Sequence, residues 1–121
     1  MTDIAAISEL ATELGIPHAV DNTFLTPFFQ RPLELGADVV VHSTTKYMDG
    51  HNSTVGGAAI AKSQEHLEAI QFVRNCLGSN MSPQVAFYTL QGTKTMSTRL
   101  EAQSASAIKV AEFLETHPMV A

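Results

Sequence analysis

The sequence has little cysteine and little positive charge, and each shortage excludes a class of protein. Cys76 is the single cysteine in 121 residues, which excludes an internal disulfide and any Cys-x-x-Cys metal site. The 7 Lys and Arg residues are outnumbered by 12 Asp and Glu residues, and no basic run exists, so nucleic acid is not an expected partner. A lone cysteine suits a reducing compartment, and we expect a cytoplasmic protein.

Long apolar runs and metal-ligand patterns are also missing. No run approaches the length of a membrane span, and the N-terminus has no basic segment followed by an apolar one. We therefore expect neither a membrane partner nor a signal peptide. His42, Asp49 and His51 fit no standard ligand spacing, so we expect no metal. What is present is ordinary for a globular chain: 45% of the residues are hydrophobic, enough for one domain with a modest core.

Periodicity predicts a first half that alternates helix and strand and a second half that is helical. Apolar spacing, caps and breakers predict helices at 2–14, 63–77, 83–92 and 93–117. Short buried strands are predicted at 18–21, 38–42 and 55–61, with irregular chain at 23–32 and turns at 32–35 and 49–52. This order is typical of an α/β fold. Because the first helix begins almost at residue 1 with no strand before it, we expect the chain to be cut from a larger α/β unit.

Two glycines stand at the start of the third predicted strand. Gly56 and Gly57 lack side chains inside an apolar run. Glycine in a strand often marks the close approach of another backbone or side chain. We therefore expect a neighbouring segment to pack tightly at this point.

Polar side chains follow two of the predicted strands at the point where each strand ends. Asp21 closes the first strand, and Ser43, Thr45 and Lys46 follow the apolar run 37–41. A crossover between these strands would make them parallel neighbours, and ligands bind at the carboxyl ends of strands in open α/β sheets. A carboxylate, two hydroxyls and a candidate nucleophilic amine are therefore expected to face one crevice. The plainer alternatives are a turn Asp and a Lys that extends into solvent.

These side-chain types suit pyridoxal 5′-phosphate. That cofactor needs an amine to bind its aldehyde, an acid to keep its ring nitrogen protonated, and donors for its phosphate. Lys46, Asp21 and the two hydroxyls supply these groups. An unrelated hydroxyl-rich loop with a salt-bridged lysine would show the same residue types, so the pattern alone leaves both interpretations open.

The strand-end residues lie within longer sequence motifs. These motifs occupy residues 20–24, 30–38 and 42–47, and further motif residues follow at Gly50-His51, Gly56-Gly57, Ser82-Pro83 and 92–96. Over essentially its whole length the sequence resembles the cysteine/methionine-metabolism family of pyridoxal-phosphate enzymes. The resemblance implies an α/β fold, a fragment of the α/β/α large domain of fold-type-I pyridoxal-phosphate transferases. Because family members are much longer, it implies that residues 1–121 are the central part of the cofactor-binding large domain, without the flanking parts and the C-terminal domain.

The resemblance also implies a role for each polar residue at the strand ends. Lys46 is the catalytic lysine, which binds the cofactor covalently and moves protons. Asp21 pairs with the pyridine nitrogen, Ser43 and Thr45 bind the phosphate, and Thr23 lines the ring. The substrate implied by the family is a small amino acid.

The implied reaction is transsulfuration by γ-replacement or elimination at C–S or C–O bonds of homoserine- or cysteine-derived amino acids, as in cystathionine γ-synthase or γ-lyase. O-acetyl- or O-succinylhomoserine sulfhydrylase and methionine γ-lyase chemistry are alternatives. Asn75-Cys76 stands where the methionine γ-lyase branch often carries Lys-Asp, which disfavours that branch.

An alternative of another class is a catalytically incomplete fragment with only a structural role in oligomer contact. The family implies a homotetramer, a dimer of dimers, for the full-length protein, and the fragment alone is expected to be inactive.

Overall fold

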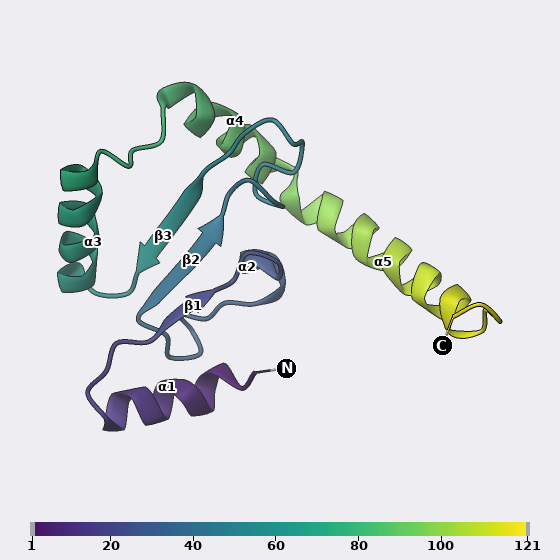
Figure 1. The fold of residues 1–121 in the computed structure, drawn as a ribbon, viewed down its shortest axis with the longest axis horizontal. Helices are drawn as coiled ribbons and strands as arrows, with labels where there is room; N and C mark the ends of the chain where they lie inside the picture. The colour runs from purple at the N-terminus through teal and green to yellow at the C-terminus, as the bar shows by residue number, and fades with distance from the viewer. Residues whose placement is uncertain (1, 121) are drawn as a thin grey trace.

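The structure is a computed structural model that describes residues 2–120, and it forms a mixed α/β unit (Figure 1). Three strands make one sheet in the order β1-β2-β3. Along the described chain the elements are α1 (Ile4–Glu13), β1 (Ala19–Asp21), α2 (Thr26–Phe29), β2 (Val39–Ser43), β3 (Gly57–Ala61), α3 (Gln64–Leu77), α4 (Pro83–Lys94) and α5 (Met96–Glu115). A sheet in the first half and helices in the second confirm the predicted α/β class.

The strands β1 and β2 are parallel neighbours, as the crossover between them predicts. Asp21 is the register partner of Val41, so the carboxyl ends of both strands meet at one edge of the sheet. β3 returns antiparallel to β2, with Gly57 opposite Ser43. The chain between β2 and β3 therefore forms a loop at the same edge at which β1 ends.

The prediction that all three strands are buried was wrong. In β2 only Val40 and His42 are buried, and Val41 is 36% exposed. β1 and β3 hold no fully buried residue. Both strands are edges of the sheet within the described chain, and α3, which packs on β3, covers the sheet only in part.

The helices begin at caps that the sequence predicts. Asp3, Ser63 and Ser82 each accept a hydrogen bond from the backbone N–H three residues on, at the start of α1, α3 and α4. Gly78 ends α3 with a left-handed φ of 66°. One expectation was wrong: α2 lies inside the stretch predicted as irregular. The predicted end of α4 near Gly92 agrees with the observed end at Lys94, two residues beyond it.

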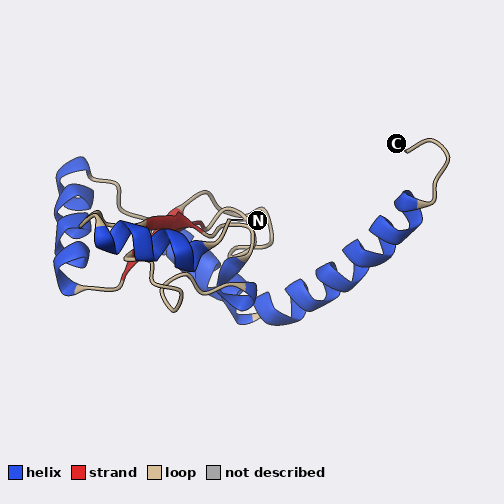
Figure 2. Ribbon diagram, turned by 90° about the horizontal axis from the view of Figure 1, so that it is seen from below, coloured by secondary structure: helices blue, strands red, loops and turns tan. Residues whose placement is uncertain are grey.

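The described chain buries little apolar surface. Its buried hydrophobic side chains are Ile4, Ala37, Val40 and Leu100. Its accessible surface is 8579 Å², whereas a compact monomer of 13.0 kDa exposes about 6,300 Å². Figures 1 and 2 show one reason: the C-terminal half of α5 runs clear of the sheet and of the other helices. Within residues 2–120 no helix is both long enough and apolar enough to cross a membrane.

Candidate functional site

Thr23 connects the ends of the two parallel strands. Its backbone N–H donates to the Asp21 carboxylate over 2.9 Å, and its hydroxyl oxygen accepts from the backbone N–H of Ser43 over 2.8 Å. Thr23 is buried, so water competes little for these bonds. Asp21, Thr23 and Ser43, which the sequence assigns to one site, are therefore brought together by direct contacts.

Asp21 is held in its ionised form. The Thr23 hydroxyl and then the Thr23 backbone N–H lower the pKa of the Asp21 carboxyl below its ordinary value. Partial desolvation raises this pKa and the nearby His42 lowers it, and the lowering effects prevail. A charged carboxylate at a strand end can accept a hydrogen bond from a protonated ring nitrogen, which is the role expected of Asp21.

His42 lies on the buried side of β2, one residue before Ser43. It is 5% exposed, and its Nδ1 atom has no hydrogen-bond partner among the residues described. Burial lowers the pKa of the ring, and this outweighs the charge of Asp21 and a bond with the Asn22 backbone, which raise it. The ring is therefore neutral at pH 7. Residues 2–120 contain no group of three His, Cys, Asp or Glu side chains placed to hold a metal ion.

Lys46 stands in a closely bonded loop between β2 and β3. Its side chain is exposed. Its backbone carbonyl accepts from the N–H of Gly50 over 2.8 Å, and the N–H of Thr44 donates to the carbonyl of Gly56 over 2.9 Å, which closes the base of the loop. The loop thus presents an accessible amine from a fixed backbone at the edge of the sheet where Asp21 lies.

The Thr45 hydroxyl closes the same loop. It accepts from the N–H of Gly56 over 3.0 Å and donates to the Gly56 carbonyl over 3.3 Å. A Cβ on Gly56 would lie 2.7 Å from Met81 Cε and 2.8 Å from Thr44 Oγ1, which confirms the close approach expected at this glycine. To donate to a phosphate, Thr45 would exchange its longer bond, because a hydroxyl carries one proton. The phosphate roles of Ser43 and Thr45 stay predictions.

Asp49 supports the loop from inside, a role that sequence reasoning missed because it assigned Asp49 only to a turn. Asp49 is 1% exposed, and its carboxylate accepts from the N–H groups of Ser53 over 2.9 Å and of His51 over 3.2 Å. Burial alone raises the pKa of this carboxyl, but these bonds, the Thr54 hydroxyl and the charge of His51 together hold the pKa below its ordinary value. The Asp-Gly pair at 49–50 signals the turn, and nothing in the local sequence shows that the carboxylate is buried.

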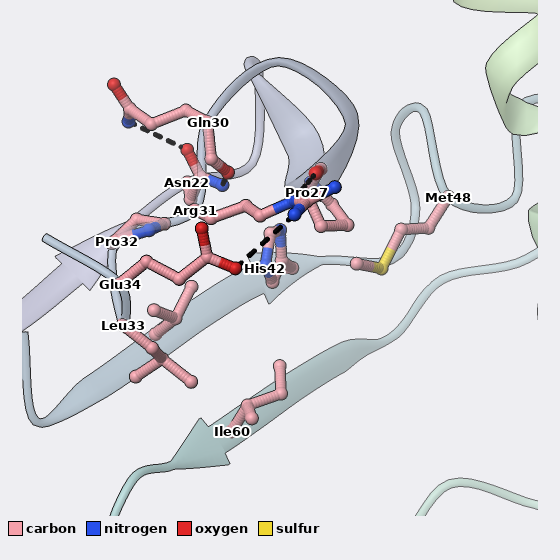
Figure 3. Close-up of a pocket in the computed structure, with 11 residues that line it drawn as sticks. Asn22, Pro27, Gln30, Arg31, Pro32, Leu33, Glu34, His42, Met48 and Ile60 are labelled. Carbon is pink, nitrogen blue, oxygen red and sulfur yellow. Dashed lines mark hydrogen bonds and ion pairs between the residues drawn. The ribbon is translucent and has the colours of Figure 1, made fainter.

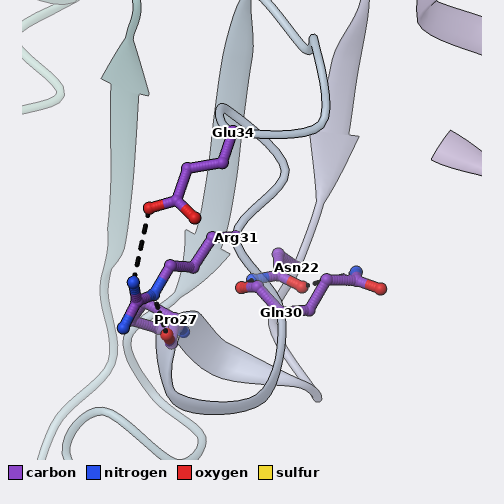
Figure 4. A network of polar contacts seen from close by, with 5 residues as sticks. All are labelled: Asn22, Pro27, Gln30, Arg31 and Glu34. Atoms are coloured by element: carbon purple, nitrogen blue, oxygen red, sulfur yellow. Dashed lines mark hydrogen bonds and ion pairs between the residues drawn. The ribbon is translucent and has the colours of Figure 1, made fainter. Parts of the chain in front are cut away.

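The chain that leaves β1 is fastened by a pair of amides (Figure 4). Asn22 Nδ2 donates to the Gln30 carbonyl over 2.8 Å, and Gln30 Nε2 donates to Asn22 Oδ1 over 2.9 Å. Asn22 is buried, so water cannot hydrogen-bond to its amide, and these two bonds take the place of water. The neighbouring ion pair of Arg31 with Glu34, at 3.3 Å, is exposed and contributes little.

A cavity of about 340 Å³ lies against the sheet beside this network (Figure 3). It is separate from the strand-end group, since none of the five residues assigned to the site lines it. Its walls come mainly from β2, β3 and the segment that follows α2. They include Pro32, Leu33, Val40, His42, Met48 and Ile60.

The groups at the strand ends fit pyridoxal phosphate. An ionised carboxylate ends β1, a hydroxyl residue ends β2, and an accessible lysine amine follows in the next loop. These are the anion, the donor and the amine that the cofactor's ring nitrogen, phosphate and aldehyde require.

The sequence matches one protein family and several known proteins over almost its whole length. A sequence model described as "Cys/Met metabolism PLP-dependent enzyme" matches residues 1–121. Cystathionine gamma-lyase of Bacillus subtilis (strain 168) is 45% identical over 120 residues, which cover 99% of this chain and 32% of that protein. Cystathionine gamma-synthase of Mycobacterium tuberculosis (strain ATCC 25618 / H37Rv) is 47% identical over 120 residues, which cover 99% of this chain and 31% of that protein.

A solved structure agrees with these relatives. Cystathionine gamma synthase from Xanthomonas oryzae pv. oryzae, in complex with aminoacrylate and cysteine, matches with a TM-score of 0.96 at 44% identity. The match covers 98% of this chain and 31% of that chain. The chain therefore spans about a third of the length of the curated relatives it matches.

Proposed function

This chain belongs to the Cys/Met metabolism PLP-dependent enzyme family, and from that premise we propose that its protein carries out transsulfuration on a homoserine- or cysteine-derived amino acid. Relatives named cystathionine gamma-synthase, gamma-lyase and beta-lyase, at 42% to 47% identity, support γ-replacement or elimination. Residues 1–121 would be the central part of the cofactor-binding domain, and the match to 32% of the first relative is in keeping with a part of a longer protein.

The residues of this chain have distinct tasks in that proposal. When bound, pyridoxal phosphate stabilises the negative charge that develops at the α-carbon of an amino acid. Lys46 would bind the cofactor through Nζ, and the same amine, when free, would accept the proton from the α-carbon. Asp21 would keep the ring nitrogen protonated, with Thr23 orienting the carboxylate. Ser43 and Thr45 would donate to the phosphate.

One observation carries the proposal. The Thr23 hydroxyl and backbone N–H hold the Asp21 carboxylate ionised and join it to the end of the strand that leads to Lys46. The Thr23 N–H bond to Asp21 would also be made by a turn Asp, and Lys46 is exposed in either case. Neither alternative would need the bond between the Thr23 hydroxyl and Ser43 or the parallel register that aligns the two strand ends. The acid and the amine are thus set on one edge of the sheet, as the family chemistry requires.

Assembly and location follow from the same proposal. A homotetramer built as a dimer of dimers would cover apolar side chains that this chain leaves exposed, such as Phe24 at 72% and Val55 at 83%. A single cysteine, Cys76, which is free and exposed, suits a cytoplasmic location.

Borohydride reduction followed by peptide mass spectrometry tests the lysine. In the intact protein that contains these residues, we expect reduced cofactor on the peptide that carries Lys46. Lys46→Ala should lose that label, and product formation should fall by at least about 10²-fold, the low end for a lost acid–base group. Lys62→Ala is the matched control, because Lys62 is exposed at the end of β3 and should leave the label and the activity in place.

Substrate choice is read from products. The intact enzyme would be supplied with cystathionine, and separately with O-succinyl- or O-acetylhomoserine plus cysteine or sulfide. Cystathionine formed from cysteine supports a synthase, its cleavage supports a lyase, and homocysteine formed from sulfide supports the sulfhydrylase alternative.

In the borohydride experiment, a label on a lysine other than Lys46, or no label at all, would refute the proposed site.

A further inference from the structure

Arg99 joins helix α5 to the loop that carries Lys46. Its Nη2 donates to the backbone carbonyl of Tyr47 over 3.0 Å and to that of Gly92 over 2.8 Å. Its Nε donates to the Thr95 hydroxyl over 3.1 Å. One guanidinium therefore connects the loop, the end of α4 and the junction between α4 and α5.

Two glycines allow this connection to be tight. Gly50 lies against the guanidinium so closely that a Cβ there would overlap the Arg99 side chain, and its φ is 69°. Gly92 lies against the backbone carbonyls of Met48 and Asp49, where a Cβ would overlap them. The segment 47–50 is thus enclosed by Arg99 on one side and by α4 on another.

Both contacts act on the residues next to Lys46. Tyr47, whose carbonyl Arg99 binds, follows the lysine directly. Gly50, which packs on the guanidinium, donates its N–H to the Lys46 carbonyl over 2.8 Å. A shift of the guanidinium would therefore move the backbone that sets the position of the lysine amine.

Arg99 is partly buried, unlike a guanidinium in an exposed ion pair. Its Nη1 atom is buried and has no hydrogen-bond partner within residues 2–120, and such a donor disfavours folding. Arg99 keeps this unmet donor while its Nη2 and Nε make three bonds that fix loop and helix. The rigid guanidinium holds Nη2 at the two carbonyls and Nε at the Thr95 hydroxyl at the same time, and the single nitrogen of a lysine ammonium cannot occupy both places.

We propose that Arg99 is a positioning residue. By binding the Tyr47 carbonyl, it fixes the position of the loop that carries Lys46 relative to Asp21. The inference rests on the function proposed for Lys46. A displacement of about 1 Å in a reacting group costs on the order of 10²-fold in rate, so fixing the loop bears directly on turnover.

The test compares Arg99→Lys and Arg99→Met with Arg31→Lys and Arg31→Met in the intact protein. Arg31 is the matched control, because its guanidinium is exposed and pairs with Glu34. Amide hydrogen exchange, measured without cofactor, is expected to become faster in residues 44–56 of both Arg99 variants and to stay near wild type in the other strands and helices. In the holoenzyme, kcat should fall by about 10²-fold while KM changes less, and the Arg31 variants should match wild type.

A third variant asks whether the guanidinium itself is needed. Low concentrations of guanidinium chloride should restore part of kcat to Arg99→Ala, and ammonium chloride at the same concentration should not. The inference is overturned by wild-type exchange in residues 44–56, by faster exchange spread evenly over the whole protein, or by equal effects of the two salts. A wild-type protein with no label on Lys46 and no product would instead count against the proposed function, and the exchange measurement without cofactor would still decide whether Arg99 fixes the loop.

Discussion

Two aspartates at the same edge of the sheet have opposite surroundings. Asp21 is exposed, so its ionised carboxylate is available to a ligand. Asp49 is 1% exposed and is occupied by the N–H groups of its own loop. Burial and the identity of the hydrogen-bond donors thus distinguish a carboxylate that supports the fold from one that is free to bind a ligand.

The acid dependence of stability should report on Asp49. The pKa of its carboxyl lies below the ordinary value of 3.8 in the folded chain, so as the pH falls the unfolded chain takes up the proton first. The stabilisation is therefore complete above the unfolded value and is lost as the pH falls through the folded pKa. Asp49→Asn should lose about 1–3 kcal/mol at pH 7, the cost of an unmet buried bond, when measured by urea unfolding of the intact protein.

The pH profile provides the control for this prediction. The difference in unfolding free energy between wild type and Asp49→Asn should shrink below pH 3.8, where the wild-type carboxyl begins to lose its advantage. Glu34→Gln, at an exposed ion pair, should leave the profile near wild type. A constant difference at every pH would show that the charge of Asp49 has no part in the stabilisation.

At the residue scale the sequence predicts what its local pattern contains. Asp21, Ser43 and Lys46 follow strands, so their position at one edge can be inferred from strand order. Arg99 could not be found in this way, because its partner carbonyl on Tyr47 lies 52 residues away in sequence and any residue type carries a carbonyl. A side chain that binds backbone leaves no pattern in the residue it binds.

Helix α4 shows a second limit of local patterns. Glycine disfavours helix interiors, and the pattern therefore predicts an end near Gly92. The helix continues because the absent side chain lets the backbone at Met48 and Asp49 lie directly on it. The tertiary contact outweighs the propensity, and that contact is made by the Lys46 loop.

Gly92→Ala separates these two effects. Helix propensity alone predicts a gain of about 1 kcal/mol for Ala over Gly. A Cβ at this position would overlap the Asp49 carbonyl, so we expect a net loss of about 1–3 kcal/mol from overpacking in urea unfolding of the intact protein. Gln84→Ala, on the exposed face of the same helix, is the control and should change stability by less than about 0.5 kcal/mol. A more stable Gly92→Ala protein would mean that the loop can move away at no cost.

The whole chain has more surface than a domain of its mass. It exposes 8579 Å² against about 6,300 Å² expected at 13.0 kDa, and the far part of α5 packs on nothing described (Figure 2). This explains why the apolar pattern predicted buried strands that the structure leaves open. Valine runs such as 39–41 predict packing partners on both faces of the sheet, and residues 2–120 supply them only in part.

Residues 1–121 expressed alone should therefore behave unlike the intact protein. Large apolar side chains are exposed on α3 and α5, such as Phe72 at 70%, Leu77 at 75% and Phe113 at 63%, and exposed apolar surface favours association and dye binding. We expect the 121-residue chain to bind ANS, to self-associate in sedimentation velocity, and to unfold in urea with a smaller m-value per residue than the intact protein, because less surface is buried in its folded state. The intact protein, measured in parallel, should bind little ANS. A monomeric 121-residue chain with a sharp urea transition and no ANS signal would show that the sheet and α5 are stable without further packing.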